Sequence, residues 1–190
     1  MAELIVDFIT SLDGYAAAEG WPGLWGKGGP EYLDWLQKQP EGDYTVLMGA
    51  ATYRLMSKLN EEGEPGTDVL ETLSTVVFSS TLRGPLAWPN AKLVSEEPIR
   101  VVREMKASAK KSMRTMGSLS LARSLLRARL VDRFRVVVFP VITGSSGRQR
   151  IYDGYPDVDL KMINSRTFDG QLQLLEYVPT ILTGPPEQKK

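Results

Sequence analysis

Two consecutive stretches decide the fold of this chain, MRTMGSLSLARSLL at residues 113–126 and LVDRFRVVVFPVITG at residues 130–144. They predict a short segment, a turn at Gly117-Ser118, an amphipathic helix and then an apolar strand of the kind covered on both faces. Gly117 lets the backbone approach a ligand closely, and Ser118 is a favoured helix N-cap residue. A helix that begins at such a turn can bind phosphate, although an ordinary strand-to-helix junction is the more common case.

The composition limits the possible functions. A chain of 190 residues fits one domain, which we expect over residues 1–182, with a flexible tail at 183–190. The formal net charge is zero and no apolar segment is long enough to span a membrane, so we expect a cytoplasmic protein without a nucleic-acid or membrane partner. The chain has neither cysteine nor histidine, which excludes the usual catalytic triads and predicts no metal site. Hydride transfer suits such a composition, because a cofactor carries the difficult step.

Strands and helices alternate along most of the chain. The pattern predicts early strands at 2–10, 43–48, 72–78 and 91–94, and helices that begin near Pro30, Gly49 and Pro98. The chain closes with strands at 160–168 and 171–178 around Asp169-Gly170, which is a strong hairpin signal. We therefore predict an α/β fold with a mainly parallel central sheet, flanking helices and a C-terminal antiparallel hairpin.

Several turns follow the predicted strands directly. They are Asp13, Gly49, Ser79, Gly117 and Gly144. Because the carboxyl ends of parallel strands meet at one edge of a sheet, these turns can line a single crevice, and the sequence predicts a nucleotide site there. The hydroxyls of residues 79–81 can bind a sugar or a phosphate, or they can cap the loop that follows.

Three other segments carry expectations. The loop at 19–30 holds Trp25, which would either cover a ligand or pack on the core. The helix that begins at Pro30 is expected to turn Leu33, Leu36 and Tyr32 inward. The basic run around Lys106, at the end of the helix that begins at Pro98, is expected to be solvated.

Six motifs in order along the chain resemble the reductase domain of the bifunctional riboflavin-biosynthesis deaminase-reductase, whose fold is that of dihydrofolate reductase. They are Ser11–Gly14, Leu47–Gly49 with Thr52-Tyr53, Val77–Leu82, Gly117-Ser118 with Leu125-Leu126, Leu130–Asp132, and Pro140–Gly144 with Gly147. The resemblance covers about residues 4–178 and includes no deaminase half, so it points to a stand-alone member.

This resemblance implies NADPH as the cofactor, a small-molecule substrate of pterin or pyrimidine type, and a homodimer. The cofactor contacts that it implies are Ile9, Ala17, Gly49, Ala51, Thr52, Ser79, Ser80, Thr81, Gly117, Ser118, Leu119, Ser120, Gly144 and Gly147. Trp25, from its place in the loop at 19–30, is a candidate substrate contact. The strands at 136–141 and 172–178 are candidates for the dimer contact, although burial in the core is the expected alternative.

The chain departs from the family pattern at two places. Ala50 and Ala51 follow Gly49 where an arginine is common, so Arg54, Arg83 or Arg148 would have to supply that charge. The helix position that carries a carboxylate in dihydrofolate reductases reads Tyr32, with Glu31 one residue earlier, which argues against efficient dihydrofolate reduction.

The family resemblance does not identify the catalytic residue. The candidates for the proton donor are Asp13, Glu31, Tyr32 and bound water, although Asp13 can simply hold its turn. The alternatives to a reductase are a catalytically silent dinucleotide-binding protein, acting as a sensor or partner subunit, and a dimeric scaffold.

Overall fold

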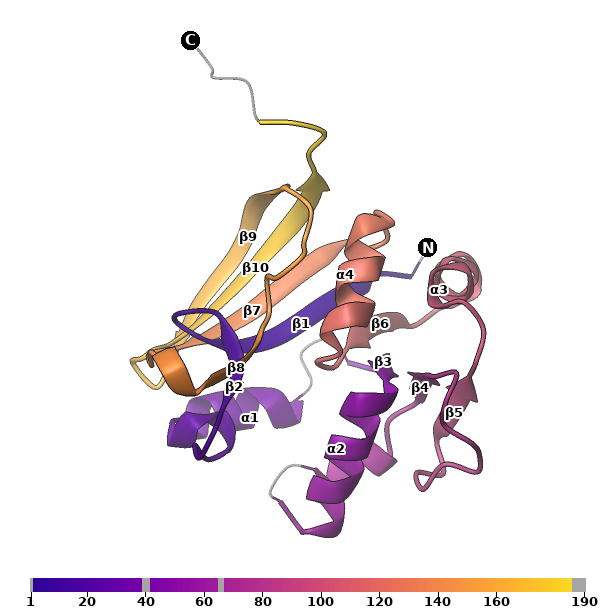
Figure 1. Cartoon of the computed structure of the whole chain (residues 1–190), viewed down its shortest axis with the longest axis horizontal. Coiled ribbons are helices and arrows are strands. Elements are labelled where there is room, and N and C mark those ends of the chain that lie inside the picture. The colour runs from indigo at the N-terminus through magenta and orange to yellow at the C-terminus, as the bar shows by residue number, and fades with distance from the viewer. Residues whose placement is uncertain (1, 39–41, 65–66, 186–190) are drawn as a thin grey trace.

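The computed structural model describes residues 2–38, 42–64 and 67–185. It contains a mixed sheet between two layers of helices (Figure 1). The strands are β1 (Leu4–Ser11), β2 (Tyr15–Ala18), β3 (Tyr44–Gly49), β4 (Thr75–Phe78), β5 (Ala91–Val94), β6 (Ser112–Thr115), β7 (Arg133–Phe139), β8 (Gly147–Arg150), β9 (Val158–Phe168) and β10 (Leu172–Ile181). The helices are α1 (Pro30–Lys38), α2 (Ala50–Glu61), α3 (Pro98–Ser108) and α4 (Leu119–Arg127), with 3-10 turns η1 (Gly23–Gly26), η2 (Asp68–Glu71) and η3 (Gly144–Ser146).

The strand order of the large sheet is β5-β4-β3-β6-β1-β7-β10-β9. Neighbours from β5 to β7 pair in parallel, whereas β10 is antiparallel to both β7 and β9. This confirms the predicted α/β fold with a C-terminal antiparallel hairpin. Asp169 and Gly170 both have positive φ in the turn between Phe168 and Leu172, the last paired residues of β9 and β10.

Helices cover the two faces of the sheet differently. Helices α3 and α4 pack on one face through a core that includes Val102, Leu121 and Leu125. Helices α1 and α2 lie on the other face, below the sheet in Figure 1. Tyr32 of α1 packs against the β7 and β9 side, and Tyr53 of α2 packs against the β3 and β4 side. The α1–α2 face therefore has two separate cores.

A cap that connects distant parts of the chain fixes the start of α1. The Asp169 carboxylate, in the β9–β10 turn, accepts hydrogen bonds from the backbone N–H groups of Glu31 at 3.0 Å and Tyr32 at 3.2 Å. The Glu31 carboxylate in turn accepts a bond from the N–H of Asp169 at 2.5 Å. A Cβ atom at Gly29 would overlap the Asp169 carboxylate, which explains the glycine there.

Several local predictions were wrong. Leu33 is 42% exposed, because the inner stripe of α1 runs through Tyr32, Trp35 and Leu36 instead. Lys106 is buried, because it forms an ion pair with Asp132 and donates to the carbonyl of Leu130 at 2.8 Å.

The irregular parts of the chain also differ from the prediction. The small antiparallel sheet of β2 and β8 and the turn η1 were not predicted, because each is only four residues long. Strands β7 and β10, the candidate dimer contacts, lie inside the sheet, which agrees with the expected alternative of core burial, and the edge strands are β5 and β9. The single domain at 1–182 and the tail at 183–190 stay predictions, and residues 186–190 lie outside the described part.

The Asp169 cap generates a test of the fold. Asn and Gly both tolerate the positive φ of residue 169, but only Asn keeps an acceptor oxygen. We expect Asp169→Asn, which keeps one of the two acceptor oxygens, to lower the free energy of unfolding less than Asp169→Gly, which should lower it by about 1 kcal/mol, the usual value of an N-cap. Urea denaturation followed by circular dichroism measures both. Equal stability of the two variants would show that the cap contributes nothing.

Candidate functional site

The parallel strands place the predicted turn residues along one edge of the sheet. Gly49 ends β3, Ser79 follows β4, Gly117 follows β6, and Asp13 and Gly144 follow β1 and β7. All of these strands run in the same direction, so the turns share the carboxyl edge, where α/β proteins bind ligands. The structure divides the predicted residues into three groups at this edge.

The first group lies where β3 and β6 lead into α2 and α4. The Ser118 hydroxyl accepts a hydrogen bond from the N–H of Gly49 at 2.8 Å and donates to Thr52 Oγ1 at 2.8 Å. Ser118 stands at the N-cap position of α4, as predicted, but its φ is 59° and its side chain makes no capping hydrogen bond to the helix. Its hydroxyl instead joins the two glycine turns. Ala51, Leu119 and Ser120 stand on the first turns of the same two helices.

Gly49 and Gly117 have no side chain that would keep a ligand away from their backbone. A Cβ atom at Gly49 would lie 3.7 Å from the nearest atom, the Ser118 Oγ, and one at Gly117 would lie 3.5 Å from Thr52. Gly117 also has a φ of +53°, which L side chains rarely adopt. Neither α2 nor α4 has a side-chain cap, so their first N–H groups are available to an anion. The residues therefore fit a phosphate-bearing ligand.

The second group is the loop after β4. Ser79 Oγ accepts hydrogen bonds from the N–H groups of Thr81 at 3.1 Å and Leu82 at 2.9 Å, so it caps the loop. Ser80 and Thr81 are exposed. The Arg83 guanidinium donates to the carbonyl of Ser80 at 3.1 Å, which keeps a cation beside these hydroxyls.

Arg83 is the best placed of the three proposed substitutes for the missing arginine. Arg148 forms an ion pair with Glu19, and Arg54 is exposed on α2 without an ion pair in the part of the chain that the structure describes.

The third group lies at the ends of β1 and β7. The Asp13 carboxylate accepts hydrogen bonds from the N–H groups of Thr143 at 3.2 Å and Gly144 at 2.9 Å. A hydrogen bond from Ser11 and these backbone donors lower the pKa of Asp13 from 3.8 to about 2, so Asp13 has no proton to give at neutral pH. Ile9 lies beside Val137 of β7, while Ala17 and Gly147 stand in the β2–β8 ladder.

The remaining predicted residues lie on helix α1 and on the turn that precedes it. Tyr32 is buried against Phe139, at 5.6 Å between ring centroids, and Phe168. Burial raises the pKa of Tyr32, and the nearby Asp7 carboxylate raises it further, so the phenol keeps its proton. Glu31 is exposed and bonded to Asp169, which removes it from this site.

Trp25 lies in the same aromatic core. Its ring packs against Phe139 at 5.1 Å, and its buried indole N–H has no hydrogen-bond partner among the described residues. Its φ of 48° is left-handed, a conformation that costs energy in a large residue. A buried orphan donor and a strained backbone together mark Trp25 as more than a packing residue.

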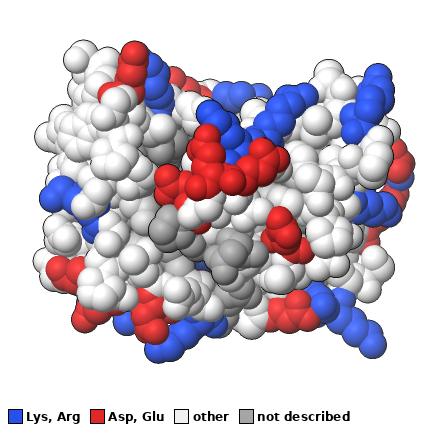
Figure 2. Space-filling view, turned by 90° about the horizontal axis from the view of Figure 1, so that it is seen from below, with Lys and Arg blue, Asp and Glu red and all other residues white. Residues whose placement is uncertain are grey.

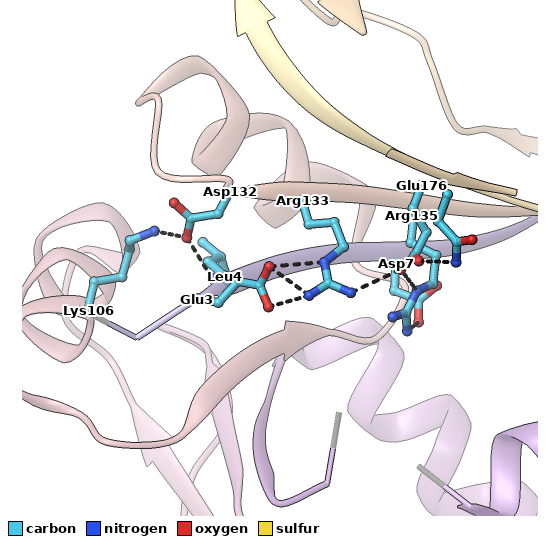
Figure 3. A network of polar contacts seen from close by, with 9 residues as sticks. Glu3, Leu4, Asp7, Lys106, Asp132, Arg133, Arg135 and Glu176 are labelled. Carbon is cyan, nitrogen blue, oxygen red and sulfur yellow. Dashed lines mark hydrogen bonds and ion pairs between the residues drawn. The ribbon is translucent and has the colours of Figure 1, made fainter. Parts of the chain in front are cut away.

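A buried network of charges, which sequence reasoning missed, crosses the sheet (Figure 3). Arg135 on β7 is 2% exposed at its side chain and lies between Asp7 on β1 and Glu176 on β10. Burial alone would raise the pKa of Glu176, but hydrogen bonds from Asn164 and Arg135 outweigh it and lower the pKa. The sequence did carry a sign of this network, because charged residues interrupt otherwise apolar strands. A charged side chain buried in a strand must be paired.

The same face carries a separate cavity of about 450 Å³ near the amino ends of the strands. It is lined by Glu3, Trp35, Ser112, Arg133, Arg135, Asn164, Arg166, Leu174 and Glu176. Figure 2 shows that acidic and basic side chains are interspersed with uncharged surface on the side seen from below. In residues 2–38, 42–64 and 67–185 there is no group of three or more acidic side chains that could hold a metal ion, and no helix long and apolar enough to cross a membrane.

The sequence is similar to one protein family and to one curated protein. The family described as the RibD C-terminal domain matches residues 2–174. The uncharacterized protein YyaP of Bacillus subtilis (strain 168) is 25% identical over 188 residues, which cover 92% of this chain and 93% of that protein.

Solved structures show the same fold. A riboflavin biosynthesis protein from Shewanella sp. PV-4 has a TM-score of 0.69 at 19% identity and covers 95% of this chain and 99% of its own. A diaminohydroxyphosphoribosylaminopyrimidine deaminase/5-amino-6-(5-phosphoribosylamino)uracil reductase from Thermotoga maritima has a TM-score of 0.64 at 16% identity, over 94% of this chain and 57% of that one. The predicted dihydrofolate reductase-like fold of the RibD reductase domain is thereby confirmed.

The bonds at Asp13 predict a pH dependence of stability. Because the folded-state pKa of about 2 lies below the ordinary 3.8, ionised Asp13 stabilises the fold above pH 3.8, and this contribution disappears as the pH falls toward 2. We expect wild type to be more stable than Asp13→Asn at pH 6 and the difference to shrink below pH 4. Urea unfolding of both proteins from pH 6 to pH 2.5 measures it. A pH-independent difference would contradict the bonds at Asp13.

Proposed function

The chain belongs to the RibD C-terminal domain family, and we propose that it is an NADPH-dependent reductase acting on a small heterocyclic substrate, of pyrimidine or pterin type. Family membership and the description of the Thermotoga maritima protein as a 5-amino-6-(5-phosphoribosylamino)uracil reductase support this reaction class. The observation that carries the proposal is the Ser118 hydroxyl joining the Gly49 and Thr52 turn to the Gly117 turn at the carboxyl edge.

In this proposal, the cofactor's phosphates lie against the first group, Gly49, Ala51, Thr52 and residues 117–120. The hydroxyls of Ser80 and Thr81, with the cation of Arg83 beside them, take the adenosine ribose and its 2′-phosphate, because phosphate prefers donors and positive charge. Ile9, Ala17, Gly144 and Gly147 contact the nicotinamide end. NADPH, when bound, supplies the hydride.

The proton comes from a different group. Asp13 is ionised, and the Glu31 carboxylate is exposed and bonded to the hairpin turn, so we assign the proton to neither. Tyr32 lies on the face that Ile9 shares, but the burial that raises its pKa makes its phenol a weaker acid. We therefore assign the proton transfer to water beside Tyr32, with Trp25 as a substrate contact.

Gly49→Ala tests the cofactor site without disturbing the free protein. The added methyl would make only an ordinary contact with Ser118 at 3.7 Å, so the variant should fold as wild type does. The added methyl would occupy the space beside the backbone into which a phosphate of the cofactor would fit. We therefore expect NADPH to bind about tenfold more weakly, a loss of about 1.4 kcal/mol in binding free energy. Quenching of tryptophan fluorescence by NADPH and by NADH measures the affinity.

The control is Gly184→Ala, where a Cβ atom meets nothing within 4 Å. Failure of the wild-type protein to bind either nucleotide at millimolar concentration would overturn the proposal. Binding without NADPH oxidation across a panel of pterins and pyrimidines would favour a silent dinucleotide-binding protein.

We also propose that the protein is a homodimer paired through β9. This edge strand is exposed from residue 159 to residue 167 and carries Met162 at 52% and Ile163 at 49% exposure. An exposed edge of this length is a ready template for pairing with a second strand.

Two copies of β9, paired antiparallel, would place apolar side chains opposite each other and opposite charges opposite each other. Glu176 pairs with Asn164 and Tyr177 with Met162, so Ile163 is an extra residue at a bulge. The bulge shifts the alternation so that Asp159 and Arg166 point to the same face. An antiparallel pair with Met162 opposite Ile163 of the partner subunit puts Asp159 opposite Arg166 of the partner subunit. Neither residue has an ion pair among the described residues.

Ile163→Lys tests the dimer. Two lysines near the centre of a symmetric pair repel each other, so we expect the variant to be monomeric, whereas wild type should have twice the 21.1 kDa mass of one chain. Size-exclusion chromatography with light scattering measures both masses. Leu55→Lys, at a similarly exposed position on α2, is the control and should stay dimeric. A monomeric wild type would contradict the dimer.

A further inference from the structure

A small two-stranded ribbon, β2 with β8, carries two of the residues that we assign to the nicotinamide end of the cofactor. They are Ala17, which pairs with Arg148, and Gly147, which pairs with Ala18. The ribbon is a sheet of its own, and each strand is four residues long and at most partly buried. Because a two-stranded ribbon is marginally stable in water, contacts outside it must hold it in place.

One end of the ribbon is held by the large sheet. The N–H of Tyr15, at the start of β2, donates to the Ser11 hydroxyl at 2.9 Å, and the Thr10 hydroxyl donates to the carbonyl of Tyr15 at 3.3 Å. Both Thr10 and Ser11 belong to β1. These bonds fix the point at which the chain enters β2, whereas the point at which it leaves β8 is held by a helix.

Residues 151–155, which we call the strap, follow β8 and run beside α4 (Figure 1). Two guanidinium groups of α4 bind the strap. Arg123 Nη1 donates to the carbonyl of Asp153 at 2.9 Å, and Arg127 Nη2 donates to the carbonyl of Gly154 at 2.6 Å. The two arginines are four residues apart, so they lie on one side of the helix, and bonds from a charged donor are stronger than neutral ones.

Gly154 lets Arg123 approach the strap closely. A Cβ atom at Gly154 would lie 2.9 Å from Arg123 Nη1, and the φ of Gly154 is +72°. In the part of the chain that the structure describes, neither Arg123 nor Arg127 has an acidic partner. The two guanidinium groups therefore bind the strap backbone rather than an ion-pair partner.

The strap also contacts the core and the turn that precedes the ribbon. Ile151 is 1% exposed in the core that α4 lines, and its N–H donates to the carbonyl of Gly14 at 3.0 Å. The Tyr152 ring lies 3.5 Å from the place that a Cβ atom of Gly14 would take. Tyr155 packs edge-on against Phe134, at 6.3 Å between ring centroids. The strap thus joins α4 to both ends of the ribbon.

Helix α4 begins at the Gly117-Ser118 turn, where the proposed function puts the cofactor's phosphates. The ribbon lies where it puts the nicotinamide. The strap is therefore a connection between the two ends of the proposed cofactor site, and Arg123 and Arg127 are its attachment points on the phosphate side.

We infer that Arg123 and Arg127 are positioning residues for the cofactor: they fasten the strap to α4 and so hold the β2–β8 ribbon where the nicotinamide binds. The inference rests on the proposed reductase function. Neither guanidinium touches the cofactor in this role. A ribbon that is already ordered lowers the entropy cost of binding the nicotinamide half, so that half alone depends on the two arginines.

Hydrogen exchange followed by mass spectrometry tests the strap on the full chain without nucleotide. The double variant Arg123→Met/Arg127→Met keeps apolar stems but lacks the donors. Its amides at 15–18 and 147–151 should exchange at least about tenfold faster than in wild type, because the ribbon opens locally, whereas those of β7 and β10 should not change. Unchanged exchange of the ribbon overturns the inference. If the double variant does not fold, Arg127→Met, at an exposed position, is judged by the same criterion.

Binding of NADPH and of 2′,5′-ADP, which lacks the nicotinamide half, tests the positioning role. Isothermal titration calorimetry with the full chain measures both affinities. We expect the double variant to bind NADPH about tenfold more weakly than wild type and to bind 2′,5′-ADP equally well, because only the nicotinamide half meets the ribbon. Equal weakening of both ligands, or unchanged NADPH binding, overturns the positioning role.

Two further variants complete the test. Arg103→Met removes an exposed arginine of α3 and should keep wild-type exchange and both affinities. Arg123→Lys/Arg127→Lys keeps a charged donor for each carbonyl and should bind NADPH more tightly than the methionine double variant. Equal NADPH binding by the two double variants overturns the role of the hydrogen bonds.

Failure of the proposed function gives a different result. If wild type binds no NADPH, the proposed function is overturned and the positioning role with it. The exchange of the ribbon, measured without nucleotide, still decides whether Arg123 and Arg127 hold it, so the two failures are distinguishable.

Discussion

The constraint on which this structure depends is a guanidinium in the middle of a sheet. Arg135 is buried at the centre of β7, and a charge there is tolerated only with opposite charges close by. Asp7 on one neighbouring strand and Glu176 on the other provide them, and Trp35 of α1 stacks on the guanidinium at 5.2 Å. The register of β1, β7 and β10 and the position of α1 are therefore coupled, and the network favours one arrangement of the site.

Elements with strong local signals could be predicted from the sequence. The hairpin at Asp169-Gly170 and the alternation of strands and helices depend on turn chemistry and on hydrophobic periodicity, which act over a few residues. The carboxyl edge of the sheet followed from the parallel direction of these strands, and it gathers the turns at Asp13, Gly49, Ser79, Gly117 and Gly144.

Contacts between distant residues could not be predicted in the same way. Ser118 looked like a helix cap, but its backbone is left-handed and its hydroxyl bonds to Gly49, 69 residues away. Lys106 looked like a solvated helix end, but it finds Asp132 in another element. Asp7 interrupts an apolar strand, and without knowledge of β6 and β7 nothing identifies its partners as Arg114 and Arg135.

The reciprocal bonds between Asp169 and the first turn of α1 have a consequence for biosynthesis. Helix α1 is made early in translation, whereas the residue that caps it is added 137 residues after Tyr32. Until the ribosome has released the β9–β10 turn, α1 in the nascent chain lacks its cap and Tyr32 lacks the aromatic partner on β9. The α1 side of the candidate site is thus completed by nearly the last part of the domain to emerge, while the glycine turns of β3 and β6 can meet earlier.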